Sequence, residues 1–148
     1  MAVLLSVSSP LVLTSISWAK TATEAEIATL VEKVKTTENE SEFVEAVVAL
    51  EKIGQPAIPA LIQLLKENKL AVRWGAADAL EHMGEPAIPA LRAALKDPDK
   101  NVRINAVSAL QGISIRERDR EGETLAALVV PELIVALQDP EPEVRHSA

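Results

Sequence analysis

The chain has 148 residues, enough for one domain, with a net charge of −7 and no cysteine. Without cysteine there is no thiol catalysis, disulfide, thiolate-bound zinc or lipoprotein anchor, and the acidic balance argues against nucleic-acid binding. Because 48% of the residues are hydrophobic but only 2% are aromatic, we expect a small-aliphatic core of closely packed helices rather than a deep ligand pocket.

Residues 1–19 contain no charged side chain and are similar to a secretory signal peptide. Ser17 and Ala19 offer small residues at the −3 and −1 positions of a cleavage site, although no Lys or Arg follows Met1. The apolar run is too short and too broken by serines and Pro10 for a stable membrane span. We expect residues 20–148 to form the folded domain, exported to the periplasm or the extracellular space if this leader directs it, and cytoplasmic otherwise.

Two helices are predicted before the repetitive part of the chain, over about 24–36 and 40–53. Thr23 with Glu26, and Asn39 with Glu42, have the spacing of a capping box, in which two side chains satisfy free amides at a helix start. We therefore expect each helix to begin directly after the first member of its pair.

A repeat of thirty residues follows. The segment QPAIPAL at 55–61 returns as EPAIPAL at 85–91, and Val72-Arg73 returns as Val102-Arg103. Such self-similarity is typical of stacked helical hairpins.

Each unit divides into two helices. Proline is tolerated in the first turn of a helix, and the spacing of Ile58, Leu61 and Leu65 gives one buried stripe. Gly54 and Gly84 stand where a residue with positive φ ends the second helix of a unit. The predicted helices cover about 56–66, 70–83, 86–96 and 100–112.

The last unit is displaced by an insertion. Val144-Arg145 follows Val102-Arg103 by 42 residues instead of 30, and the added segment near 114–124 (SIRERDREGET) predicts a solvated loop. A helix over about 125–138 follows, and the chain then stops in the first turn of another helix. We expect a piece of a longer repeat protein, or end-to-end stacking on another chain, because a solenoid needs a polar cap.

The pattern of a proline-containing first helix, an Asp-Pro turn, Val-Arg and then Ala-Leu resembles HEAT repeats, specifically the short type of phycobilisome lyase-like proteins. The resemblance covers residues 41–148. It implies an all-α fold, an α-α superhelix (a HEAT-like solenoid) of about three helical hairpins plus an N-terminal helix. The function it implies first is a non-catalytic scaffold whose partner is another protein.

The resemblance also implies that the arginine of each Val-Arg pair bonds to an acid in the turn of a repeat. This reading makes the arginines structural; a row of anion-binding arginines is the alternative, against which the matched acids argue. The ladder would consist of Arg73, Arg103 and Arg145 with Glu67, Asp97 and Asp139.

Three other functions follow from the same resemblance. A bilin lyase subunit or phycobilisome-handling factor is the main alternative. A deoxyhypusine hydroxylase would need paired His-Glu dipeptides for two irons, whereas His82 follows Glu81 and His146 precedes Ser147. A HEAT-like DNA glycosylase would need a basic concave face. We therefore predict no catalytic residues, no metal and no cofactor.

The second helix of each unit is expected to line the concave face, where solenoids bind partners. Large exposed apolar groups such as a Trp and an Ile are candidate anchors for a partner. The competing interpretation is that Trp74 packs over a neighbouring helix. The residues placed on this face are Trp74, Asp78, His82, Ile104, Ser108 and Gln111.

Overall fold

A computed structural model of the chain describes the backbone of residues 10–121 and 124–148, and the side chains of 23–116 and 129–148. Over these residues the chain forms eight α-helices, joined by turns and two short 3₁₀ segments, without any strand. The all-α superhelix predicted from the repeat is therefore confirmed. The helices are α1 (Pro10–Thr36), α2 (Glu40–Ile53), α3 (Ile58–Leu64), α4 (Leu70–Met83), α5 (Ile88–Ala94), α6 (Lys100–Glu121), α7 (Thr124–Ala136) and α8 (Pro142–Ser147).

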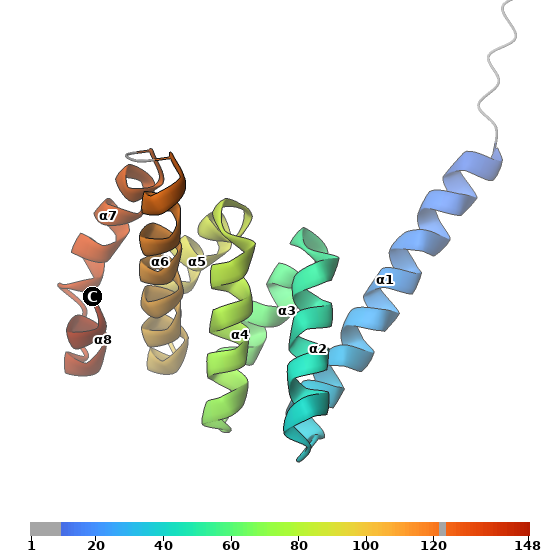
Figure 1. Cartoon of the computed structure of the whole chain (residues 1–148), viewed down its shortest axis with the longest axis horizontal. Coiled ribbons are helices and arrows are strands. Elements are labelled where there is room, and N and C mark those ends of the chain that lie inside the picture. The colour runs from blue at the N-terminus through green and yellow to red at the C-terminus, as the bar shows by residue number, and fades with distance from the viewer. Residues whose placement is uncertain (1–9, 122–123) are drawn as a thin grey trace, which may run out of the picture.

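The helices stack in two layers. In Figure 1, α2, α4 and α6 stand side by side nearest the viewer, α3 and α5 lie behind them, and α1 leaves the N-terminal end of the stack at an angle. One aliphatic core runs between the layers, with fully buried leucines from both. These leucines are Leu50, Leu61, Leu65, Leu80, Leu91 and Leu110.

The thirty-residue repeat is visible in the backbone. Gly54 and Gly84 end α2 and α4 with φ of 77° and 67°, in the left-handed region that other residues rarely adopt. Each is followed by a proline-containing 3₁₀ turn, Gln55–Ala57 or Glu85–Ala87, that leads into α3 or α5. The two units therefore enter and leave their helices in the same way.

The N-terminus of α2 is capped by Asn39. Its Oδ1 accepts hydrogen bonds from the amides of Ser41 and Glu42, at 2.9 and 3.2 Å. The return half of the capping box is different: the Asn39 amide donates to Thr37 Oγ1, and that hydroxyl donates to the Glu42 carboxylate. Thr37 therefore stands between the two members of the box.

The start of α1 differs from the prediction. The helix begins at Pro10, so Thr23 and Glu26 lie inside it and do not cap a helix at residue 24. Proline fits a first turn, and no later residue of α1 breaks the helix. Residues 1–9 of the expected leader lie outside the described residues, and 10–19 are helical. Within the part of the chain that the structure describes, no helix combines the length and apolar character that a membrane crossing requires.

The expected loop at 114–124 is also different, because α6 continues to Glu121. The segment from Ser114 to Glu121 contains arginines and glutamates, which favour helix, and has neither glycine nor proline. Residues 122–123 lie outside the described residues. The charged run through Glu121 is therefore helical here.

The arginine ladder ties each turn to the helix that follows it. In every repeat the arginine Nη1 donates to the backbone carbonyl of the predicted acid, and also to the carbonyl one residue later. Within a repeat the acceptor is thus the acid's main chain, where we expected its carboxylate. The first of these bonds join Arg73 to Glu67 at 2.7 Å, Arg103 to Asp97 at 2.8 Å and Arg145 to Asp139 at 2.7 Å.

A side-chain ion pair links one repeat to the next. Arg103 Nε and Nη2 donate to the two carboxylate oxygens of Asp139 at 2.8 and 3.1 Å, and the side chains are only 11% and 9% exposed. The bond from Arg103 holds the pKa of Asp139 below its usual value, and Asp139 in turn raises the pKa of Arg103. The pair therefore fixes the turn before α8 onto α6.

Candidate protein-binding groove

A groove of about 570 Å³ runs over the layer of second helices. Its lining comes from three helices that are far apart in the sequence but adjacent in the stack. The lining residues are Phe43 from α2, Ala71, Trp74, Gly75, Ala77, Asp78 and Glu81 from α4, and Asn105, Ser108 and Ala109 from α6.

Two glycines set how closely the helices approach. A Cβ on Gly75 would lie 2.7 Å from the Phe43 ring, so the ring of α2 lies directly over the backbone of α4. A Cβ on Gly112 would lie 2.1 Å from the Glu81 carboxyl group, so that side chain lies against α6. Small residues therefore bring the walls of the groove together.

Trp74 forms the exposed wall. Its side chain is 62% exposed, which confirms the exposed position predicted from helical spacing and leaves most of the indole uncovered by neighbouring helices. Asp78 lies one turn further along the same face of α4, and Ser108 faces the groove from α6. The structure thus brings together three of the six predicted residues.

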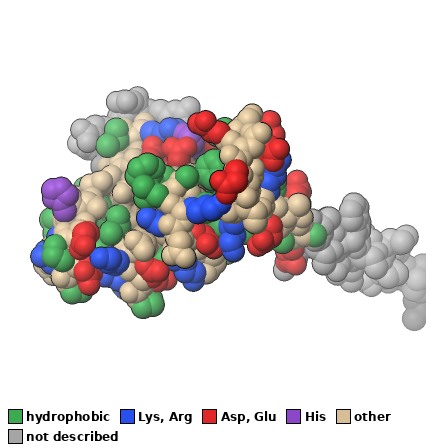
Figure 2. Space-filling view, turned by 90° about the horizontal axis from the view of Figure 1, so that it is seen from below, with side chains coloured by type: hydrophobic (Ala, Val, Ile, Leu, Met, Phe, Trp, Pro, Cys, Tyr) green, Lys and Arg blue, Asp and Glu red, His purple; other side chains and the backbone are tan. Residues whose placement is uncertain are grey.

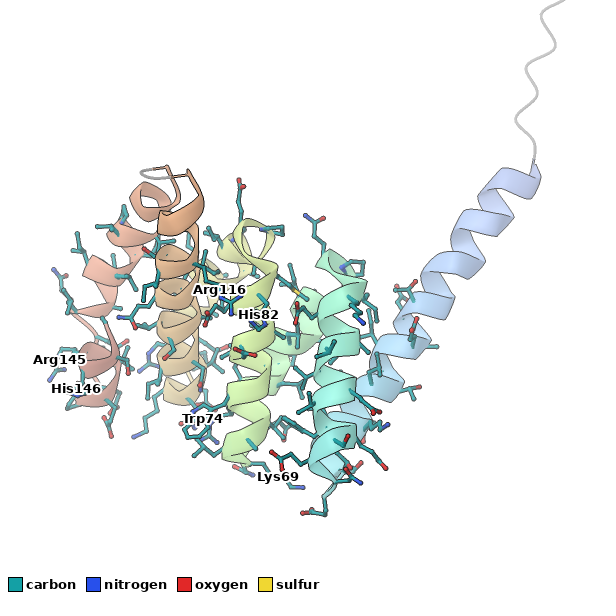
Figure 3. The ribbon with its side chains drawn as sticks, in the orientation of Figure 1. Lys69, Trp74, His82, Arg116, Arg145 and His146 are labelled. Carbon is teal, nitrogen blue, oxygen red and sulfur yellow. The ribbon has the colours of Figure 1, made fainter. Side chains whose placement is uncertain are left out.

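An ionic cluster joins the second helices near their C-terminal halves. His82 Nδ1 lies 3.4 Å from the Glu51 carboxylate and 3.5 Å from that of Asp78. Arg116 Nε lies 2.9 Å from the Glu81 carboxylate, and its guanidinium also contacts the His82 ring (Figure 3). The cluster crosses from α2 through α4 to α6.

Sequence reasoning placed Asp78 and His82 of this cluster on the concave face but did not predict the contacts with Glu51 and Arg116. Glu51 and Glu81 are separated by the repeat length, so their equivalence was available as a signal. Arg116 lies in the segment that was predicted to be a loop. Its position on α6, facing α4, was therefore not predicted.

Two of the predicted residues face elsewhere. Ile104, expected to be exposed, is half-buried and packs against the small cluster around Val144 of α8. Gln111 Nε2 donates to the backbone carbonyl of Ala148 at 3.0 Å. The reason is that α8 packs on α6 and covers the side of α6 that carries Ile104 and Gln111. The equivalent side of α4 carries Trp74, which is exposed.

The charge of the groove is acidic. The described residues that line it include two carboxylates, Asp78 and Glu81, and neither Lys, Arg nor His. Figure 2 shows acidic and basic side chains intermixed over the lower end of the stack, without a broad region of one sign. A glycosylase-like function would need a basic groove, and the charge here has the opposite sign.

Among the described residues no group of three or more His, Asp and Glu side chains is arranged to hold an ion. His82 and His146 lie on α4 and α8, at separate places in the stack (Figure 3).

The chain belongs to the HEAT-repeat family. The family model of HEAT repeats matches residues 27–111, 72–130 and 88–148, which together span the stack from α1 to α8. The family resemblance of the sequence is therefore confirmed. No curated protein matches the chain.

Two solved structures are similar to the chain to different degrees. The complex of CpcE and CpcF of phycocyanin lyase from Nostoc sp. is similar with a TM-score of 0.52 and 24% identity, over 83% of this chain and 74% of that one. An engineered protein matches with a TM-score of 0.39 and 23% identity, over 82% of this chain and 58% of that one. The first likeness supports the lyase-like type of HEAT repeat as a statement about fold.

Proposed function

We propose that this chain is a non-catalytic scaffold that binds another protein in the groove over α2, α4 and α6, with Trp74 as the anchor. The observation that carries the proposal is the indole of Trp74, which is 62% exposed at the wall of a groove formed by three helices. Second helices of a solenoid are its usual binding face.

Energetic reasoning favours Trp74 over the rest of the groove. A few buried aromatic side chains carry most of the binding free energy of an interface, and substituting such a side chain by alanine costs about 2 kcal/mol or more. Phe43, the other aromatic residue of the groove, is already partly buried against the core. The groove therefore has one large apolar side chain free to insert into a partner.

The test is quantitative affinity capture with the full chain as bait in a lysate of the source organism. We expect a partner whose recovery falls about thirtyfold or more with Trp74→Ala. Ile134→Ala is the matched control, since Ile134 is also exposed but lies on α7, away from the groove. Equal recovery with wild type and Trp74→Ala would refute the proposal, and loss with Ile134→Ala alone would move the binding site to α7.

The likeness to the complex of CpcE and CpcF of phycocyanin lyase supports a second candidate, a bilin lyase subunit or phycobilisome-handling factor. In that case the chain would bind a linear tetrapyrrole or assemble with a second subunit that does. Titration of a free bilin with the chain, followed by visible absorption, distinguishes the two. A saturable spectral change that Trp74→Ala abolishes would favour the bilin role, whereas an unchanged spectrum leaves the scaffold.

A further inference from the structure

The polar groups of the groove mainly accept hydrogen bonds. The Ser108 hydroxyl already donates to the Ile104 carbonyl at 3.2 Å, and the amide nitrogen of Asn105 donates to the Asn101 carbonyl at 2.7 Å. Asp78 offers a carboxylate, which can only accept. The chemistry that complements such a lining is a group rich in N–H donors.

The negative charge in the groove is only partly balanced. The Glu81 carboxylate is 2.9 Å from Arg116 Nε, so it is neutralised within the stack. Asp78, whose side chain is 61% exposed, lies 3.5 Å from His82 Nδ1, a partner that is charged only when protonated. Asp78 therefore presents a carboxylate that a cation from outside can approach.

Trp74 and Asp78 are placed to act on one cation together. They are one turn apart on the same face of α4, and both line the groove. An indole face attracts a cation, and a guanidinium can stack on it while its planar N–H groups bond to a carboxylate. An ammonium group lacks this planar geometry, so the pair favours arginine over lysine.

The groove continues beyond Trp74 toward the start of α2. Phe43 and Ala71 also line a second hollow of about 420 Å³ that reaches Glu40 and the pair of Glu38 with Lys69. Continuity along the stack favours an extended segment over a compact molecule. Beyond the paired Glu38 and Lys69, Glu40 adds one more carboxylate along this path.

We propose that the groove binds an arginine side chain on an extended segment of the partner protein, with its guanidinium stacked on Trp74 and bonded to Asp78. This rests on the proposed function and specifies the partner's chemistry. Because both charges are partly exposed, the interaction weakens as ionic strength rises.

The probe for this proposal is N-acetyl-L-arginine N-methylamide, compared with the citrulline analogue, which has nearly the same shape but no charge. Binding is followed by ¹H–¹⁵N NMR on the full chain through the indole N–H of Trp74, with Trp18 as a reference signal in the same spectrum. We expect a saturable shift of the Trp74 signal and at least fivefold weaker binding of the citrulline analogue. Equal shifts with both compounds would overturn the proposal.

The variant Asp78→Asn keeps the size of the side chain and removes its charge. We expect arginine binding to fall about threefold to tenfold, with the Trp74 signal still at its wild-type position without ligand. Glu85→Gln is the control, an exposed acid outside the groove, and should leave binding unchanged. Undiminished binding by Asp78→Asn would contradict the pairing.

The experiments distinguish failure of the arginine proposal from failure of the proposed function. If Trp74→Ala abolishes partner capture but the arginine probe binds no better than citrulline, the groove is a binding site of different chemistry and this inference falls. If capture survives Trp74→Ala, the proposed function falls instead, and the inference that rests on it falls with it.

Discussion

At the scale of single residues, Arg103 and Asp139 join two repeats through a nearly buried ion pair. Exposed salt bridges contribute little to stability, but removing one partner of a buried pair leaves a charge without compensation. The Asp139 carboxylate also accepts from the Glu141 amide at 2.9 Å. This one side chain therefore holds both the turn before α8 and its attachment to α6.

We predict that Asp139→Asn lowers the free energy of unfolding by about 2 kcal/mol, because it removes charge-assisted hydrogen bonds to Arg103. Urea unfolding followed by circular dichroism measures the change. Glu143→Gln is the matched control, since the Lys100–Glu143 pair also links α6 to α8 but is about half exposed, and its midpoint should not move. A midpoint for Asp139→Asn equal to that of wild type would show that the pair is not stabilising.

The same pair predicts how stability depends on pH. The bond from Arg103 lowers the folded-state pKa of Asp139 below its unfolded value of 3.8. The stabilising effect is therefore fully present above about pH 4 and is lost as pH falls through the folded-state pKa. The difference in unfolding free energy between wild type and Asp139→Asn should stay constant from neutral pH to about pH 5 and shrink below pH 4. A difference that shrinks above pH 5 would assign the effect to another group.

Substitution by alanine at Gly75 and at Gly112 should affect the free energy of unfolding differently. A Cβ on Gly75 meets the partly buried Phe43 ring, so Gly75→Ala should destabilise the fold by about 1 kcal/mol, overpacking outweighing the gain in helix propensity. At Gly112 the clash is with the flexible end of Glu81, which can swing aside. Gly112→Ala should therefore be neutral or stabilise by up to about 1 kcal/mol. Urea unfolding of both variants checks this contrast, and equal destabilisation would contradict it.

At the scale of helices, the sequence predicts where a helix begins or ends when one residue there caps the helix or adopts a positive φ. Asn39 and the two positive-φ glycines set the ends of α2 and α4 at the predicted residues. The extension of α6 to Glu121 was not predictable from charge, because an exposed helical turn and a solvated loop have the same polar composition. The start of α1 was predicted wrongly because Thr23 and Glu26 have the spacing of a capping box but lie inside a helix that begins earlier.

The residues of the groove were predictable from the sequence only in part. Helical spacing places Trp74, Asp78 and Ser108 on one face, and the structure agrees. Helical spacing does not show which residues of a face are covered by another helix. The contacts that Ile104 and Gln111 make on the side of α8 were therefore missed. Tertiary packing decides exposure once two repeats differ in their neighbours.

The surface of α7 gives a prediction at this scale. Val130 and Ile134 of α7 and Leu137, the residue directly after it, recur at helical spacing and are each about half exposed, at 46%, 53% and 53%. We predict that this apolar stripe drives association of the chain with itself at high concentration. Sedimentation or light scattering over a range of concentrations should show a rising mass, and Ile134→Asp should abolish it. A monomer at every concentration would contradict the prediction.

At the scale of the whole molecule, α2, α4 and α6 together form one continuous surface. The repeat stacks α2, α4 and α6 side by side (Figure 1). Glycines bring these helices close, and the contacts of His82 with Glu51 and of Arg116 with Glu81 join neighbouring helices. A stack of this kind has little enclosed volume but a long groove. The function proposed for it, recognition of a partner protein along several helices, uses this shape.

Amide hydrogen exchange of the full chain, with and without the partner captured by wild type, tests this account most directly. We predict that the partner slows exchange in residues 71–81 of α4 and 105–112 of α6, which line the groove or adjoin it, and leaves α3 and α5 unchanged. Slowed exchange confined to α7, or to the layer of α3 and α5, would place the partner on another face and contradict the central claim.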